Sequence, residues 1–411
     1  MRTRRAICIL ACVVASWIAG RGAAAQERSD DGFDFIDTSF ENASPAWYDR
    51  AADGTIELHL LYDHERSAPN RAAGHIHVRL HGKAGARLTL EFKNLDNVYN
   101  GKPGSVAGEL KSVVVSENGR DWTSVATDSL PGNRIRLTVV MPGPALYVAR
   151  LEPYRLSDLD RLVGSIRNDP RVQLAAIGQT AEGRSLEMIR IGNPRAPYRV
   201  FLRARAHPWE AGSNWIVEGL VHRLLAKDDE ARRFLDHYVV YVLPMANKDG
   251  VAHGMTRFNV RGKDLNRNWN LPADPDLAPE NAALERWLER MIADGQRPHL
   301  AIELHNDGSG RLHISRPPVP QLSRHLERMA MLERLLRKET WFTEGSTNEA
   351  FRNSGTLGDG WLERYGIDAV VHEFNCNWIA GREARPLARD WREYGEKLAL
   401  VFDEYFAAVK P

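Results

Sequence analysis

The feature that most constrains the fold is an alternation of strand-like and helix-like segments that begins after Arg155. Short apolar runs of strand length alternate with longer segments whose apolar residues recur at helical spacing, and the first helix is expected to begin with Ser157 as its cap. The expected strands are residues 199–203, 238–243, 299–304 and 369–374. Strands that alternate with helices predict an α/β fold, in which helices flank a mixed, largely parallel sheet.

The segment from residue 33 to residue 148 has a different pattern, in which short alternating runs are separated by turn residues. The expected strands are residues 55–61, 75–80, 87–92, 113–115 and 134–140. Several short strands at this spacing predict an all-β antiparallel sandwich domain before the α/β domain. Because the segment has no cluster of metal-binding or acid–base residues, we expect a structural module, with a binding face as the alternative.

The N-terminus has the pattern of an export signal. Basic residues precede an apolar stretch over residues 6–19, and small residues follow at Ala23–Ala25. This arrangement predicts a cleaved secretory signal, with an uncleaved anchor as the alternative. The protein is therefore expected to be exported, periplasmic or secreted, without a membrane span in the mature chain. The expected domains are a signal peptide over residues 1–25, a β-sandwich over residues 26–152 and a catalytic domain over residues 153–411.

The net charge and the cysteine content indicate which partners and which cross-links this chain is not expected to have. The formal net charge of the whole chain is +1 at pH 7. A nearly neutral protein gives no electrostatic reason to expect a nucleic acid as partner. Cys376 is the only cysteine after the predicted signal, so no internal disulfide is expected.

Residues that can bind a metal follow three of the predicted strands. His207 and Glu210 lie just beyond the first strand, His305 directly follows the third, and Glu373 stands at the end of the fourth. In open α/β sheets, ligands bind outside the carboxyl ends of the strands, so these side chains are expected to meet. Two histidines and one carboxylate form the ligand set of a catalytic zinc site. We therefore predict one Zn²⁺ per chain on His207, Glu210 and His305, with Glu373 as the base that deprotonates a water.

The polar segment between these positions supplies candidates for substrate binding. Arg267, together with Asn266, could hold a substrate carboxylate by a bidentate contact. Arg257 could stabilise the oxyanion that forms when water attacks a carbonyl. Asp264 could orient a ligand histidine. The alternative is that these residues are only the solvated surface of polar loops.

These residues, in this order, resemble the zinc metallocarboxypeptidase family of carboxypeptidase A over most of residues 155–400. The motifs are His207-x-x-Glu210, His305 in E-L-H, the Asn247–Gly250 loop and G-K-D-L-N-R-N at Gly262–Asn268. The resemblance implies the zinc ligands named above, with Arg257 as oxyanion residue, Asn266 and Arg267 as ligands of the C-terminal carboxylate, and Glu373 as catalytic glutamate. It is closest to the cytosolic carboxypeptidase-like branch, whose members carry a β-sandwich before the catalytic domain.

Two positions depart from the family pattern. Phe351 stands where digestive members have a mobile tyrosine. Either Gly358 or Asp359 falls at the floor of the specificity pocket. Asp359 would favour a basic C-terminal side chain, whereas Gly358 would leave the pocket open. No basic residue is evident there, so removal of glutamate is not supported.

The sequence therefore predicts a metallocarboxypeptidase that hydrolyses the C-terminal peptide bond, with a peptide or protein C-terminus as its partner. One alternative is a zinc amide deacylase that acts on small acylated amino acids. The other is a non-catalytic binding protein. Such a protein is expected to have lost a metal ligand or the base, and this chain has all four residues.

Overall fold

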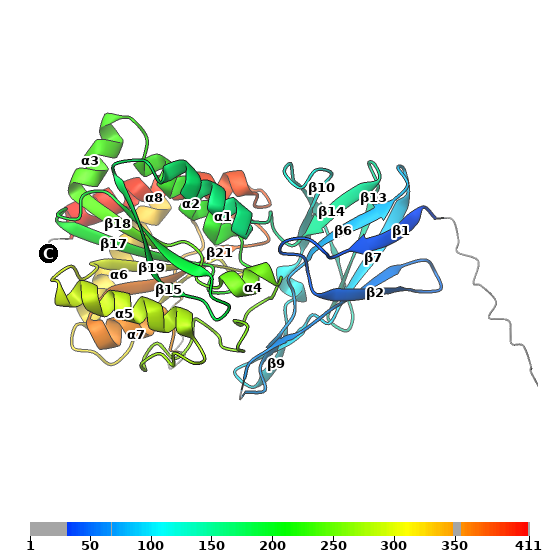
Figure 1. The fold of residues 1–411 in the computed structure, drawn as a ribbon, viewed down its shortest axis with the longest axis horizontal. Coiled ribbons are helices and arrows are strands. Elements are labelled where there is room, and N and C mark those ends of the chain that lie inside the picture. The colour runs from blue at the N-terminus through cyan, green and yellow to red at the C-terminus, as the bar shows by residue number, and fades with distance from the viewer. Residues whose placement is uncertain (1–30, 67, 348–354, 410–411) are drawn as a thin grey trace, which may run out of the picture. The chain divides into compact units, whose positions relative to one another are not determined.

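The computed structural model describes residues 31–66, 68–347 and 355–409 of the chain (Figure 1). The predicted signal peptide lies outside the described residues. Among the described helices, none is both long enough and apolar enough to cross a bilayer.

The first part of the described chain contains two five-stranded sheets that share one apolar core. Leu58, Val78 and Phe92 are almost fully buried in it. One sheet has the order β1 (Phe33–Asp37), β6 (His77–Gly82), β14 (Ala145–Ala149), β10 (Ser112–Ser116), β11 (Thr123–Ala126). The other has the order β12 (Asp128–Leu130), β13 (Arg134–Val140), β7 (Arg87–Lys93), β3 (Ile56–Leu60), β2 (Ala46–Arg50).

This arrangement confirms the predicted β-rich region, with one correction to its antiparallel character. β3 and β7 pair in parallel, whereas the other pairs within the two sheets are antiparallel. After β3 the chain enters the opposite sheet as β6 and then returns as β7, so that β3 and β7 run in the same direction. The predicted domain boundary after residue 152 stays a prediction.

A third sheet of short strands is absent from the sequence prediction. Its order is β4 (Asp63–His64), β5 (Arg71–Ala72), β8 (Asp96–Tyr99), β9 (Lys102–Ser105). Strands this short offer too few alternating positions for a pattern to be recognised. We refer to these four strands as the small sheet.

The second part of the chain is built on a seven-stranded mixed sheet. Its order is β15 (Val172–Gln179), β16 (Ser185–Ile191), β18 (Tyr238–Leu243), β17 (Tyr198–Ala204), β19 (Leu300–Asp307), β21 (Asp368–Asn375), β20 (Leu312–Ile314). The four central strands, from β18 to β21, are parallel to one another. The outer strands β15 and β16 on one side and β20 on the other pair antiparallel with their neighbours. The four predicted strands are therefore the parallel centre of the sheet.

Helices cover both faces of this sheet (Figure 1). Those on one face are α1 (Leu156–Ile166), α2 (Gly212–Leu224), α3 (Asp229–His237), α6 (Leu322–Glu339) and α8 (Ala388–Ala408). Those on the other are α5 (Pro279–Ala293) and α7 (Leu357–Tyr365). Shorter elements are α4 (Lys248–Ala252), η1 (Ala107–Glu109) and η2 (Ala380–Arg382). The two faces alternate along β17, where Leu202 faces the first set and Phe201 the second.

The start of α1 differs from the prediction in one residue role. Arg155, not Ser157, is the N-cap, and the carboxylate of Asp158 accepts the Arg155 backbone N–H at 2.7 Å. The Ser157 hydroxyl donates instead to Glu41 at 2.7 Å, a contact over 116 residues of chain. A serine at a helix start is an N-cap only when its own backbone stays non-helical.

Candidate metal centre and active site

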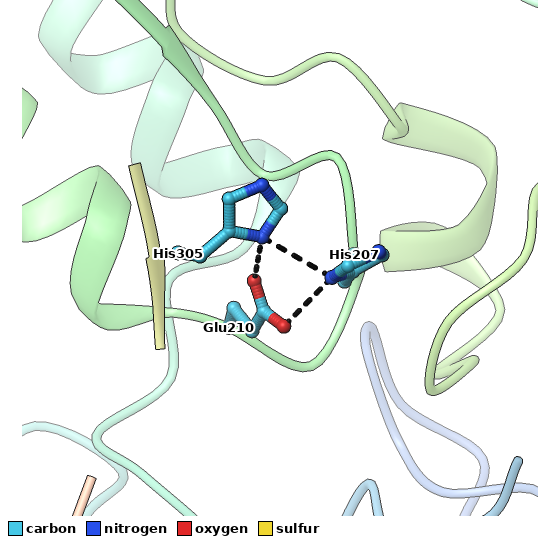
Figure 2. Close-up of side chains that lie close together, drawn as sticks. All are labelled: His207, Glu210 and His305. Atoms are coloured by element: carbon cyan, nitrogen blue, oxygen red, sulfur yellow. Dashed lines mark hydrogen bonds and ion pairs between the residues drawn. The ribbon is translucent and has the colours of Figure 1, made fainter. Parts of the chain in front are cut away.

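His207, Glu210 and His305 meet at the carboxyl end of the parallel strands (Figure 2). One oxygen of Glu210 lies 2.8 Å from Nδ1 of His207, and the other lies 2.6 Å from Nδ1 of His305. The two Nδ1 atoms are 3.2 Å apart. All three residues are buried. The sequence prediction brings together residues almost a hundred positions apart, and the structure places them in contact.

Local backbone geometry directs the two segments toward each other. Arg205 follows β17 with φ of 61°, which turns the chain out of the sheet before His207. Its buried guanidinium donates to the Pro208 carbonyl at 2.7 Å and to the Asn214 side chain at 2.8 Å. His305 needs no such turn because it lies in β19, within the regular parallel ladder. Arg205 therefore links the His207–Glu210 turn to α2 through these two hydrogen bonds.

The far nitrogens of both imidazoles contact carboxylates. Nε2 of His207 lies 3.2 Å from Oδ1 of Asp264, as the sequence prediction requires. Nε2 of His305 lies 3.5 Å from Glu303, a fully buried residue that the prediction does not include. At His207 the Asp264 carboxylate favours the tautomer with its proton on Nε2 and leaves the Nδ1 lone pair free. Both histidines present Nδ1 toward Glu210.

This donor set fits a zinc ion by its chemistry. Two imidazole nitrogens and a carboxylate, all within 4.8 Å of one another, are the three protein ligands of a catalytic zinc site. Burial raises the pKa of the Glu210 carboxyl, but the adjacent His207 and His305 outweigh burial and hold that pKa well below its usual range. Glu210 is therefore ionised, the form that a metal ligand needs.

Glu373 lies directly beside His305, because β19 and β21 pair these two residues in register. One of its carboxylate oxygens, Oε2, is buried and has no hydrogen-bond partner among the described residues. Burial, together with nearby Asp307, raises the pKa of Glu373 well above its usual value. An unpartnered carboxylate oxygen with a raised pKa is suited to exchange a proton with a bound water.

Arg257 and Arg267 differ in their ion pairing. Nε of Arg257 lies 2.8 Å from Oδ2 of Asp264, so this carboxylate links Arg257 to His207. Arg267 donates to the Asn266 carbonyl at 2.8 Å, and it has no ion pair with any residue in the described part of the chain. A half-buried guanidinium without a carboxylate partner can bind an anion from outside.

Asn266 is more engaged than the sequence prediction assumes. Its side-chain oxygen accepts the Leu357 backbone N–H at 2.9 Å, and its side-chain nitrogen lies 3.1 Å from Nε2 of His305. Both ends of the amide thus contact protein groups. The predicted role of Asn266 in binding a substrate carboxylate stays a prediction.

These residues surround a cavity of about 300 Å³. The lining includes His207, Glu210, Arg257, Arg267 and Glu373. Asp307 and His313 also line it, as do three residues of the β-rich region that the prediction treats as structural: Tyr99, Asn100 and Glu109. Burial raises the pKa of Glu109 to about 7 against the effect of Arg150. A cavity shared between distant segments leaves no periodic signal in the sequence, so these residues could not be found by pattern.

Of the two positions that depart from the family pattern, the structure describes only the one at Gly358 and Asp359. Phe351 lies outside the described residues. The carboxylate of Asp359 accepts the N–H and hydroxyl of Thr356 at 3.1 and 3.0 Å, so it caps α7. Among the described residues, Thr356 lines the cavity, whereas Gly358 and Asp359 do not.

The Asn247–Gly250 motif supports the site from behind. The Asn247 side chain donates to the carbonyls of Ala206 and Phe258, and thereby joins the segments that precede His207 and follow Arg257. Asp249 is fully buried and accepts hydrogen bonds from Thr180 and from the Glu182 backbone. This motif is structural, and it links the loops that carry His207 and Arg257.

Comparison with known proteins agrees with this geometry. Residues 163–306 match the family model described as zinc carboxypeptidase. The chain is 35% identical over 109 residues to human cytosolic carboxypeptidase 1, which is 26% of this chain and 9% of the human protein. It is 26% identical over 194 residues to an uncharacterized protein of Zymomonas mobilis, which is 47% of this chain and 49% of that protein. The matches thus span less than half the length of these curated relatives.

The fold is shared over a greater length. The structure of a metallo-carboxypeptidase from Burkholderia cenocepacia superimposes with a TM-score of 0.76 and 20% identity, and covers 91% of this chain and 98% of that one. At this identity, the likeness shows the fold alone. Residues 163–306 thus resemble the zinc carboxypeptidase family, and the cytosolic carboxypeptidases are similar to this chain over a part of its length.

Proposed function

We propose that this protein is a zinc-dependent metallocarboxypeptidase that releases the last residue of peptides or proteins. The observation that carries the proposal is the convergence of His207, Glu210 and His305, with Glu373 in register beside His305. Arg267, which has no ion pair with any described residue, lines the same cavity. Ligands, base and anion-binding group therefore share one compartment.

In the proposed reaction, His207, Glu210 and His305 hold one zinc ion. When bound, the ion supplies Lewis acidity, which lowers the pKa of a water toward neutrality and polarises a carbonyl. Glu373 takes a proton from the attacking water and returns it to the leaving amine. Arg257 stabilises the negative charge that develops on the carbonyl oxygen.

Selection of the C-terminal bond depends on Arg267. A free terminal carboxylate would form a charge-assisted contact with this guanidinium, which has no carboxylate partner to displace within the described residues. The position of the carboxylate then fixes which peptide bond reaches Glu373. An internal peptide bond or an amidated terminus would lack that contact.

The test is a panel of peptides that differ in their last residue, each made with a free and an amidated C-terminus. The zinc-loaded protein is expected to release the last residue from free peptides much faster than from amidated ones. The activity should disappear on chelation and return with added zinc. Equal cleavage of free and amidated peptides would remove the role proposed for Arg267.

The same panel separates the alternatives. Rapid hydrolysis of N-acyl amino acids, with no release from longer peptides, would indicate an amide deacylase on the same scaffold. Zinc content near zero in freshly purified protein, with no turnover of either substrate class, would indicate a non-catalytic binding protein.

We also propose that the protein is exported to the periplasm or secreted, on the pattern of residues 1–25 alone. Mass spectrometry of the protein recovered from its native cells tests this directly. A mature chain beginning at Gln26 is expected, and an intact N-terminus on protein found in the cytosol would contradict it.

A further inference from the structure

Asp63 in β4 of the small sheet contacts a loop that lies 193 to 195 residues further along the chain. Its Oδ2 accepts the backbone N–H of Arg257 at 2.8 Å and that of Phe258 at 2.7 Å. Its Oδ1 accepts the N–H of Thr256 at 3.4 Å. Hydrogen bonds from several backbone N–H groups to one carboxylate are charge-assisted and strong. Asp63 therefore fixes the backbone at Arg257.

The side chain of Arg257 is held at two further points. Its guanidinium carbon lies 4.9 Å from the centre of the Tyr99 ring in β8, a cation–π distance. Its Nε and a terminal nitrogen each lie 2.8 Å from Oδ2 of Asp264. Two of these three anchors, Asp63 and Tyr99, belong to the small sheet.

The loop that carries Arg257 has little structure of its own. Residues 253–278, all of which the structure describes, contain no helix or strand. The segment just after β4 approaches this loop closely at Gly262, whose carbonyl accepts the Arg66 N–H at 2.7 Å. Gly262 has φ of +74°, and a β-carbon there would lie 2.8 Å from the Arg66 nitrogen. Only glycine therefore permits this contact.

We infer that Asp63 and Tyr99 are positioning residues, which hold Arg257 where the substrate carbonyl is attacked. The small sheet then contributes to the active site by positioning one of its residues. This inference rests on the proposed function, in which Arg257 stabilises the oxyanion. A guanidinium that is already oriented stabilises developing charge without reorganisation during the reaction. Loss of Asp63 should therefore lower kcat more than it raises KM, because Arg267 still binds the terminal carboxylate.

The experiment is a double-mutant cycle on the full-length, zinc-loaded protein with a free peptide as substrate. Arg257→Ala is expected to lower kcat about 100- to 1,000-fold, as loss of an oxyanion donor does. Asp63→Ala alone should lower kcat at least ~10-fold, the scale of a misplaced catalytic group. In the Arg257→Ala background, Asp63→Ala should add nothing, because it acts through Arg257.

Matched variants separate positioning from folding. Asp63→Asn keeps an oxygen that can accept from Arg257 and Phe258, so it should restore most of the rate. Tyr99→Phe keeps the ring and should resemble the wild type, whereas Tyr99→Leu should lose rate. Asp53→Ala is the control, because Asp53 accepts a backbone N–H from Thr55 at 3.0 Å in a turn of the same region. If Asp63→Ala does not fold, Asp63→Glu, which displaces the carboxylate by one methylene, takes its place in the cycle.

The outcomes divide as follows. If Asp63→Ala lowers kcat by the same factor in the wild type and in the Arg257→Ala variant, Asp63 has a structural role and the inference is overturned. Unchanged kcat in Arg257→Ala also overturns it, but leaves a zinc peptidase intact. If the wild type hydrolyses no peptide, the proposed function fails. Amide hydrogen exchange then tests independently whether Asp63 holds the backbone at Arg257. Faster exchange at the Arg257 and Phe258 amides in Asp63→Ala, but not in Asp63→Asn, supports the anchor, and unchanged exchange refutes it.

Discussion

Asp264→Asn changes one atom of a carboxylate that lies between a proposed zinc ligand and the proposed oxyanion residue. Oδ1 of Asp264 is 3.2 Å from Nε2 of His207, and Oδ2 is 2.8 Å from Nε of Arg257. Both contacts use an oxygen, and asparagine has only one. If that oxygen stays on Arg257, the amino group faces Nε2 of His207 and favours the tautomer with its proton on Nδ1. That tautomer has no lone pair to offer toward Glu210 and His305.

We expect Asp264→Asn to weaken zinc binding about 10- to 100-fold, the usual cost of losing a group that orients a ligand histidine. This corresponds to roughly 1.4–2.8 kcal/mol. In the opposite orientation, the amide oxygen stays on His207. The NH2 group of the amide then faces the Arg257 guanidinium, so that two hydrogen-bond donors face each other. Because each orientation damages one of the two groups, kcat should also fall when zinc is saturating.

The assay is competition for zinc between the protein and a chromophoric chelator, with kcat measured afterwards at saturating zinc. Asp249→Asn is the matched control: Asp249 is also fully buried, but it is bonded to Thr180 and to the Glu182 backbone. Asp249→Asn should bind zinc as the wild type does. The reasoning is refuted if Asp264→Asn binds zinc as tightly as the wild type, or if Asp249→Asn weakens binding equally.

Three further predictions follow from the same geometry. Glu373→Gln should retain zinc and lose kcat about 10²- to 10⁴-fold, the range for a general base, and an active variant would contradict the base assignment. Arg267→Ala should lower kcat/KM for free peptides roughly 10- to 150-fold, since hydrogen bonds to charged groups contribute about 1.5–3 kcal/mol. The rate on amidated peptides should not change, and an equal loss on both forms would argue against a carboxylate contact. Burial, with nearby His75 and Arg155, lowers the pKa of His77 to about 3. As the pH falls through 6.5, this histidine therefore takes up a proton in the unfolded state but stays neutral in the folded state. The contribution of His77 to the free energy of unfolding should therefore be complete above pH 6.5 and decrease below it by up to about 1.4 kcal/mol per pH unit. In His77→Gln, Tm should decline less steeply between pH 6.5 and 4. Identical declines in both proteins would contradict this contribution.

The parallel centre of the sheet could be predicted because its strands are buried on both faces and read as unbroken apolar runs. β18, for example, is buried at every position. Once those strands are parallel, His305 and Glu373 fall at the same edge, and their exact pairing follows from the β19–β21 register. The positions of His305 and Glu373 could therefore be predicted from the ends of the strands, whereas His207 and Glu210 lie in the loop that follows β17.

Other features depend on contacts that no local pattern encodes. The antiparallel edge strand β15 is only partly buried, so its apolar signal is weak. Glu109 lines the cavity from a three-residue 3-10 helix, and Asp63 contacts the backbone at Arg257 from a two-residue strand. The role predicted for Asn266 did not anticipate that the Leu357 N–H would use its side-chain oxygen. In each case a distant partner decides the role of the residue.

Zinc K-edge absorption spectroscopy of the purified, zinc-loaded protein, combined with metal analysis, tests the proposed metal centre most directly. One zinc per chain is expected, with two imidazole nitrogens and a carboxylate oxygen in its coordination shell. The His305→Ala variant should lose one imidazole from that shell, or the metal altogether. A zinc ion with other ligands, or the same spectrum in His305→Ala, would contradict the site formed by His207, Glu210 and His305.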